Sequence, residues 1–372
     1  MRKIGVAIAF VLANTAQAVG PGWPPEPLIE MHVQAPPSAF PSAGRTYLVY
    51  EVLLTNLDKT TLDISRLEVH DADDMAAAPI AVLEAEQLDK DLQHFGDPAV
   101  GDRIPDATAA HRHLTAGETV IVFLAIVVAP DARIPERLSH RLFTGGASIE
   151  GAIVRTRATR LRVIGPPVEG NSWHAFSGAG DNNSHHRRQL FVLGGHASLP
   201  NRHAIDWVHT ENGANFSGPE GENRSYYSYG RRVLAVADGT VVKVTDGIPD
   251  NAPGHVGAES LKLSLETFAG NTIVLDLGQG QYAHYMHLQT GSPRVKVGQR
   301  IRRRELIALV GTSGSSFEPH LHFEVTTSPA PGVGEGLPYL LDEYEVVTNG
   351  VAEYRRRELP TEGMTVNFAS AR

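Results

Sequence analysis

The chain has 372 residues, of which 42% are hydrophobic and 20% are charged, and its formal net charge is −9. This composition excludes a chain that is disordered throughout and is ample for two domains. The 17 His and the absence of Cys exclude a disulfide framework, a thiolate zinc site and a cysteine nucleophile, so imidazole and carboxylate remain as transition-metal ligands. The negative charge argues against nucleic acid as a partner, because no excess of cations is present to replace its counterions.

Residues 1–18 have the pattern of an export signal. Arg2 and Lys3 precede an apolar run from Ile4 to Ala13, and a small-x-small pattern ends at Ala18. This apolar run is too short to span a bilayer. We therefore predict cleavage near Ala18 and a periplasmic or secreted protein with no membrane span.

Residues 22–165 consist of short strand-like runs separated by turn residues. The run at 47–54 ends at turn residues, and the run at 62–69 alternates apolar and polar side chains. The run at 119–128 is apolar on both faces, as expected for a central strand. This pattern predicts an immunoglobulin-like β-sandwich. We interpret it as an interaction or positioning domain, whose partner the sequence does not name.

A stiff Gly165-Pro166-Pro167 segment marks the expected domain boundary. Residues 166–330 hold 11 of the 17 His and are again rich in strand patterns, without the strand–helix alternation of a parallel sheet. We therefore predict an all-β chain, in which an antiparallel β-sheet domain at 166–330 follows the sandwich. Residues 331–372 are expected to form a C-terminal extension.

The segment from Glu318 to Val325 reads E-P-H-L-H-F-E-V. Side chains alternate along a strand, so His320, His322 and Glu324 should share one face while the apolar residues between them face the core. Two imidazoles on one face of a rigid strand suit one metal ligand and one group that acts on the same substrate.

The segment from Tyr282 to Leu288 reads Y-A-H-Y-M-H-L. Alternation assigns His284 and His287 to opposite faces, so at most one of them should serve the site from this strand. Periodicity does not choose between the two.

Asp206 lies in an apolar strand-like run, where an unpaired carboxylate is costly, so it needs a metal ion or an Arg as its partner. His203 is three residues away and should point to the other face of that strand. It is therefore a poor co-ligand for Asp206.

Four motifs in this order resemble the M23 (LytM/lysostaphin-type) zinc metallopeptidase family over roughly residues 173–328. They are H-A-I-D, Y-x-x-Y-M-H-L, V-x-V-G-Q-R-I and G-T-S-G-x-S-x-x-P-H-L-H-F-E-V, and H-L-H with its preceding turn is the most specific part. The resemblance implies that Asp206 and His322 bind Zn²⁺ and that His287 and His320 are the catalytic pair that flanks the attacking water. It also favours His287 over His284.

One motif position departs from the family pattern, because Arg202 stands four residues before Asp206, where the family usually has its first His ligand. Three explanations are open. An imidazole of the preceding H-H-R-R segment fills the place, a register shift brings in His203, or Arg202 pairs with Asp206 in a site without metal.

Residues 182–206 resemble a divergent branch of the family, in which an H-R-R segment precedes an R-x-A-I-D-W stretch. This resemblance favours His186 as the third ligand over His185 and His203. Three protein ligands, His186, Asp206 and His322, would leave the fourth tetrahedral position open, as in catalytic zinc sites.

These features predict an exported zinc-dependent endopeptidase that hydrolyses peptide bonds in peptidoglycan cross-links, with a peptidoglycan peptide or another peptide as its substrate. The alternative is a catalytically degenerate M23-like module that docks on a cell-wall hydrolase or on peptidoglycan. The distances in the fold from His186 or His185 to Asp206 and His322 distinguish the two hypotheses.

Overall fold

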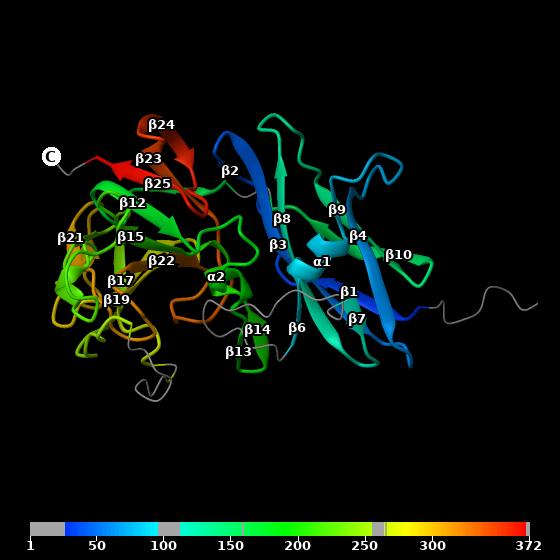
Figure 1. The fold of residues 1–372 in the computed structure, drawn as a ribbon, viewed down its shortest axis with the longest axis horizontal. Coiled ribbons are helices and arrows are strands. Elements are labelled where there is room, and N and C mark those ends of the chain that lie inside the picture. Colours follow the sequence, from blue (N-terminus) through cyan, green and yellow to red (C-terminus); the bar gives the residue numbers. More distant parts are fainter. Residues whose placement is uncertain (1–26, 96–111, 158–159, 255–263, 265, 370–372) are drawn as a thin grey trace, which may run out of the picture.

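The computed structural model describes residues 27–95, 112–157, 160–254, 264 and 266–369 (Figure 1). The predicted export signal at 1–18 lies outside these residues. None of the helices among the described residues has the length and the apolar character needed to cross a membrane.

The N-terminal part consists of two sheets that pack face to face (Figure 1). The first contains β1 (Ile29–Val33), β2 (Phe40–Ser42), β3 (Arg45–Asn56), β6 (Leu92–His94) and β8 (Thr119–Val128). The second contains β4 (Leu62–Asp71), β5 (Ala81–Glu84), β7 (His113–Leu114), β9 (Arg137–Thr144) and β10 (Ala147–Arg155), and α1 (Ala85–Asp91) follows β5. The two sheets bury a common core, as a β-sandwich should. The immunoglobulin-like assignment is more specific than these observations and stays a prediction.

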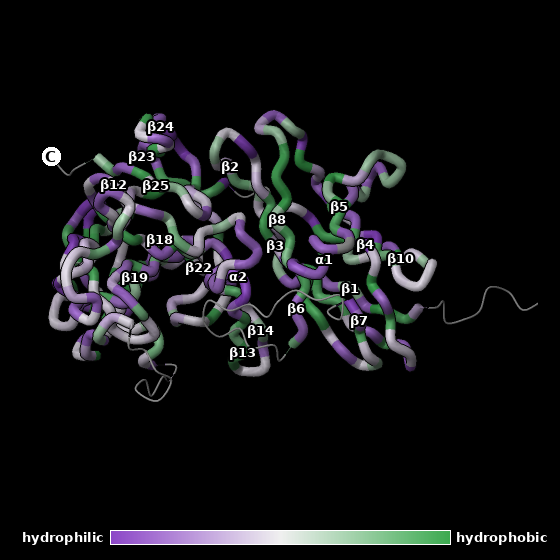
Figure 2. The backbone as a smooth tube through the Cα atoms, viewed as in Figure 1, coloured by the Kyte–Doolittle hydropathy of each residue, from purple (hydrophilic) through white to green (hydrophobic). Residues whose placement is uncertain are grey.

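The sheet that contains β3 and β8 is buried on both of its faces. One face, with Tyr50 and Val122, packs into the sandwich core. On the other face, Phe123 packs against Leu199 of the C-terminal part, and Val49 belongs to the C-terminal core. β8 lies between β3 and β6, as its two-sided apolar pattern predicts, and Figure 2 shows hydrophobic stretches along both β3 and β8. The second domain is what buries the outer face.

The C-terminal part is built around one large sheet. Its strand order is β11-β23-β25-β12-β15-β22-β19-β18-β17-β20, with β24 paired to β23. The bounds are β11 (Arg162–Ile164), β12 (Gly170–Phe176), β15 (Ile205–His209), β17 (Gly239–Thr245), β18 (Asn271–Gly278), β19 (Gln281–Leu288), β20 (Arg300–Ile301), β22 (Leu321–Thr326), β23 (Tyr339–Thr348), β24 (Val351–Glu358) and β25 (Thr365–Phe368).

Short elements lie beside this sheet. They are α2 (His185–Arg188), η2 (Pro200–His203), η3 (Asn223–Ser225) and the strand pairs β13 (Phe191–Leu193) with β14 (His196–Ser198) and β16 (Arg232–Leu234) with β21 (Leu306–Leu309). The neighbours in the large sheet pair antiparallel, as predicted, except that β11 runs parallel to β23. Strands β23 to β25, which lie in the predicted extension, belong to this same sheet.

Candidate metal centre

Two neighbouring strands of the large sheet place Asp206 and His322 directly opposite each other. Asp206 lies on β15 and His322 on β22, and the antiparallel register pairs their Cα atoms. Nδ1 of His322 lies 3.0 Å from Oδ1 of Asp206, and both side chains are buried. The two predicted ligands therefore meet because of a cross-strand pair between residues far apart in the sequence.

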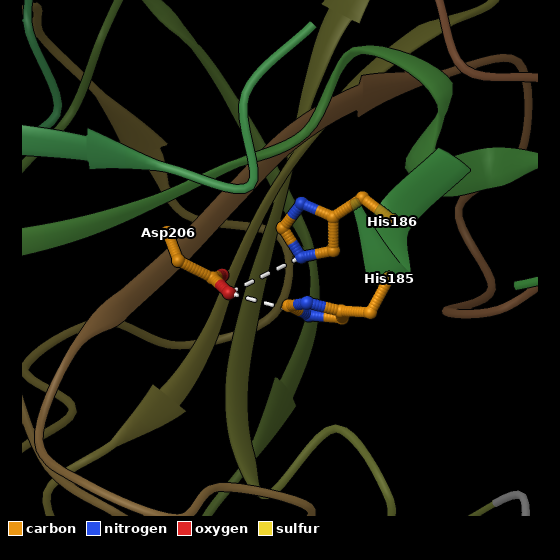
Figure 3. Close-up of side chains that lie close together, drawn as sticks. All are labelled: His185, His186 and Asp206. Carbon is orange, nitrogen blue, oxygen red and sulfur yellow. Dashed lines mark ion pairs between the residues drawn. The ribbon is translucent and has the colours of Figure 1, made fainter. Parts of the chain in front are cut away.

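The short helix α2 brings two further imidazoles to the same carboxylate. Nε2 of His186 lies 3.3 Å from Oδ2 of Asp206, and Nε2 of His185 lies 3.5 Å from it (Figure 3). One potential ligand atom from each of these three side chains lies within 4.8 Å of the other two. The helix begins after Ser184, whose hydroxyl accepts a hydrogen bond from the backbone N–H of Arg187.

The hydrogen bonds of His186 determine which ring nitrogen faces the centre. Its Nδ1 lies 2.8 Å from the carbonyl oxygen of Ser177, which can only accept, so Nδ1 carries the proton of the neutral ring. Nε2 then points a lone pair at Asp206 and is buried, with no hydrogen-bond partner among the described residues. At this distance from a carboxylate Nε2 must either carry a proton or share a metal ion with it, so the residues present fit a metal ion.

His287 reaches the centre through an irregularity in its strand. Its φ is +59°, in the left-handed region, and the pairing of β18 with β19 shifts register nearby. Its ring centroid lies 5.0 Å from that of His320 and 5.9 Å from that of His322. The prediction that His284 and His287 occupy opposite faces assumed regular alternation, and that assumption is wrong here, because a β-bulge reorients one side chain relative to its neighbours.

His284 lies on the same strand but deeper in the sheet. It pairs in register with Glu324, and its Nε2 donates a hydrogen bond to the backbone carbonyl of Ser328 at 2.8 Å. It is completely buried. Its bonds therefore hold it in the sheet, whereas His287 contacts His320 and His322.

His287 and His320 are oriented in the same way as His186. Nδ1 of His287 donates to the carbonyl of Ser313, and Nδ1 of His320 donates to the carbonyl of Glu318, both at 2.8 Å. In the neutral form of each ring Nε2 is therefore the unprotonated nitrogen, and that of His320 lies 3.5 Å from Oδ1 of Asp206. Two such nitrogens beside a metal site can accept and return a proton.

The charges at the centre depend on one another. Burial alone would raise the pKa of Asp206, but the neighbouring His186 and His320 hold it well below its usual range. Burial would lower the pKa of His322, but its hydrogen bond with Asp206 and the nearby carboxylate of Glu324 raise it to about 10. Burial, reinforced by His320, lowers the pKa of His287, which keeps that ring neutral.

The two remaining explanations for the missing family ligand do not match the structure. Arg202 binds the carboxylates of Glu51 and Glu335 rather than that of Asp206. His203 is buried, with its ring edge-on against Phe40 at a centroid distance of 5.4 Å. Both residues lie in η2, which ends before β15 begins. Both contact the N-terminal part, Arg202 through Glu51 and His203 through Phe40.

Sequence reasoning missed the groups that orient these imidazoles. Nε2 of His322 faces the buried carboxylate of Glu324 at 3.6 Å, a contact typical of metal-binding His. Strand alternation had placed Glu324 on the correct face but had given it no role. The carbonyls of Ser177, Ser313 and Glu318 carry no sequence signal, since every residue has a carbonyl.

The centre opens into a cleft of about 380 Å³. Aromatic and apolar side chains line much of it, and amide and carboxylate groups lie among them. Outside the five predicted site residues, the lining includes Phe176, His185, Gln189, Asn201, Val208, Glu220, Tyr226, Phe268, Met286, Phe317 and Glu318. Such a mixture suits a peptide better than a small apolar ligand.

Comparisons with known proteins find a family match that includes part of this site. Residues 224–331 match the model of peptidase family M23. An uncharacterized metalloprotease of Haemophilus influenzae is 34% identical over 111 residues, which are 30% of this chain and 22% of that protein. The peptidoglycan DD-endopeptidase ShyB of Vibrio cholerae is 39% identical over 64 residues, which are 17% of this chain and 15% of that protein. The matches thus cover less than a quarter of each relative.

Among solved structures, the catalytic domain of lysostaphin from Staphylococcus simulans is 24% identical, with 31% of this chain and 77% of that chain covered and a TM-score of 0.20. The family match includes His287, His320 and His322, whereas His186 and Asp206 precede it. The similarity to peptidase family M23 thus covers residues 224–331 of this chain.

Proposed function

We propose that this protein is an exported zinc-dependent endopeptidase that hydrolyses peptide bonds in peptidoglycan cross-links. The observation that carries the proposal is the convergence of His186 and His322 on the two oxygens of Asp206, with His287 and His320 beside them. The apolar start of the chain supports export, and the similarity to a peptidoglycan endopeptidase supports the substrate class.

In this proposal His186, Asp206 and His322 hold the metal. His185 is the weaker candidate, because its side chain is 33% exposed and its Nδ1 bonds to the hydroxyl of Ser177, which can itself turn. His186 is buried, and a backbone carbonyl fixes its ring. Zn²⁺ bound by these residues would polarise a scissile carbonyl and lower the pKa of a water molecule in the open fourth position.

His287 and His320 supply the proton transfers. In the neutral form of each ring Nε2 is the unprotonated nitrogen, since Nδ1–H donates a hydrogen bond to a backbone carbonyl. A ring that accepts the proton of the attacking water at Nε2 becomes an imidazolium, which can then donate to the oxyanion or return the proton to the leaving amine. Their ring centroids are 5.0 Å apart, close enough for both to act on one peptide bond.

The same convergence supports an enzyme over the degenerate binding module. The binding module was the alternative because the family's first ligand position holds Arg202. In the structure, Arg202 is engaged by Glu51 and Glu335, and His186 faces Asp206 from the other side. A third proposed ligand is therefore present despite the substitution.

The test is a measurement of zinc content together with the release of muropeptides from purified peptidoglycan. The wild type should carry one zinc and release peptide fragments, and His320→Ala should release far fewer. His113→Ala is the matched control, since His113 is half exposed on the N-terminal sandwich. A wild-type protein without zinc, with no more release than His320→Ala, would contradict the proposal.

A further inference from the structure

Helix α2, which carries His186, forms contacts with the N-terminal sandwich as well as with its own domain. α2 has four residues, too few for a helix to be stable without tertiary contacts. His186 points from it to Asp206, whereas the next two residues, Arg187 and Arg188, are buried against the sandwich. The position of His186 therefore depends on what holds these two Arg side chains.

Arg188 is held by backbone carbonyls and an aromatic ring of the sandwich. Its guanidinium donates to the carbonyls of Lys90 and Leu92 and lies 4.5 Å from the ring centroid of Phe123. Nearby, the amide of Asn182 donates to the carbonyl of Phe123 at 3.0 Å. Asn182 and α2 thus pack against α1, β6 and β8 of the sandwich.

Arg187 is held by a buried carboxylate on the sandwich. It donates to the carboxylate of Glu51 on β3 and to the carbonyl of Tyr50. Both Arg187 and Glu51 are 1% exposed. A buried carboxylate is stable only with cationic partners, and the nearby Arg202 and Arg187 hold the pKa of Glu51 below its usual range.

Glu51 also binds the segment that precedes Asp206, the other proposed ligand. Nη2 of Arg202 lies 2.7 Å from Oε2 of Glu51, and Arg202 belongs to η2, which ends just before β15 and Asp206. One carboxylate of the N-terminal domain therefore binds both segments, α2 with His186 and η2 before Asp206.

We propose that Glu51 is a positioning residue for the metal centre, which it stabilises by holding Arg187 and Arg202 and thereby the spacing of His186 and Asp206. The inference rests on the proposed function, in that these two residues are taken as ligands. It gives the N-terminal sandwich a part in the site, although the sandwich contributes no ligand.

The experiment measures the zinc affinity of the full chain by chelator competition and the visible d–d spectrum of its Co²⁺ form. Glu51→Gln should bind zinc about 10- to 100-fold more weakly, as other outer residues of metal sites do, and should alter the Co²⁺ spectrum. Glu51→Asp should recover part of the affinity. Glu68→Gln is the matched control, because Glu68 is also a buried, Arg-paired carboxylate but lies on the other N-terminal sheet.

A second variant covers the case in which Glu51→Gln does not fold. Arg187→Gln leaves Glu51 paired with Arg202, and it should weaken zinc binding to a similar degree. Folded variants whose zinc affinity and Co²⁺ spectrum equal those of the wild type would overturn this inference alone. A wild-type chain that binds no zinc would overturn the proposed function, and this inference with it.

Discussion

The guanidinium of Arg202 forms a buried ion pair with the carboxylate of Glu51, with Nη2 and Oε2 2.7 Å apart. This pair joins the two halves of the chain at the position where a zinc ligand would stand in the family that the sequence resembles. Arg202 therefore makes a domain contact at that position, and in the proposed site the ligand comes from α2 instead.

Breaking that pair should destabilise the protein. Arg202→Met leaves a buried carboxylate with one cation fewer, and we expect the free energy of unfolding to fall by about 3–5 kcal/mol. Denaturant unfolding measures the change. Arg303→Met removes an exposed pair with Asp342 and should cost less than about 1 kcal/mol. An Arg202→Met protein as stable as the Arg303→Met protein would show that the Arg202–Glu51 pair does not stabilise the fold.

The two adjacent imidazoles of α2 should differ in their effect on zinc. His186→Ala removes the proposed buried ligand, so we expect the zinc affinity to fall more than about 100-fold, beyond what loss of an outer residue causes. His185→Ala should keep zinc, because its ring is partly exposed and bonds to a hydroxyl. Metal analysis after dialysis distinguishes them, and the reverse order would make His185 the ligand.

Removing either imidazole of the proposed catalytic pair should lower activity without removing zinc. His287→Ala and His320→Ala remove proton-transfer groups, so kcat should fall by roughly 10²- to 10⁴-fold while zinc stays bound. Steady-state kinetics on a peptide substrate, with metal content measured on the same samples, test this. Loss of zinc in either variant would show that the residue is a ligand instead.

Zinc binding should release a proton near neutral pH. The pKa of His322 is raised to about 10, so its ring is protonated at pH 7 without metal, and Nδ1 must lose a proton to become a ligand. The zinc affinity should therefore rise with pH, by up to about tenfold per unit below that pKa. Calorimetry in buffers of different ionisation enthalpy counts the protons, and a count of zero would contradict this protonation state.

A buried His in the sandwich should make stability depend on pH. Nδ1 of His140 donates to the carbonyl of Ala152, Nε2 accepts from the hydroxyl of Tyr50, and burial lowers the pKa of His140 to about 4. The unfolded chain, with a His pKa of about 6.5, binds more protons than the folded chain between these values. Stability should therefore be lost as pH falls from about 6.5 to about 4, by at most about 3 kcal/mol.

The comparison of wild type with His140→Gln isolates this contribution, because the other buried His titrate alike in both proteins. The unfolding free energies of the two should converge as the pH falls through this window. A constant difference between them would show that His140 does not change its protonation on unfolding.

Part of the site could be predicted from the alternation of side chains along one strand. The alternation of E-P-H-L-H-F-E-V placed His320, His322 and Glu324 together, and the structure has His320 and His322 at the centre with Glu324 behind His322. Alternation failed at His287, because its positive φ and the shift in register depend on how β18 pairs with β19. The alternation of side chains along one strand does not determine how that strand pairs with its neighbour.

By itself, the sequence determined the kinds of ligand the protein could use and the all-β character of both halves. Composition and side-chain alternation act over a few residues, so they can be read directly. The tertiary structure decided that His322 faces Asp206, that α2 brings His186 to the same carboxylate and that Glu51 binds Arg202. These contacts join residues far apart in the chain, and they form because strand register and the burial of β3 and β8 on both faces bring those residues together.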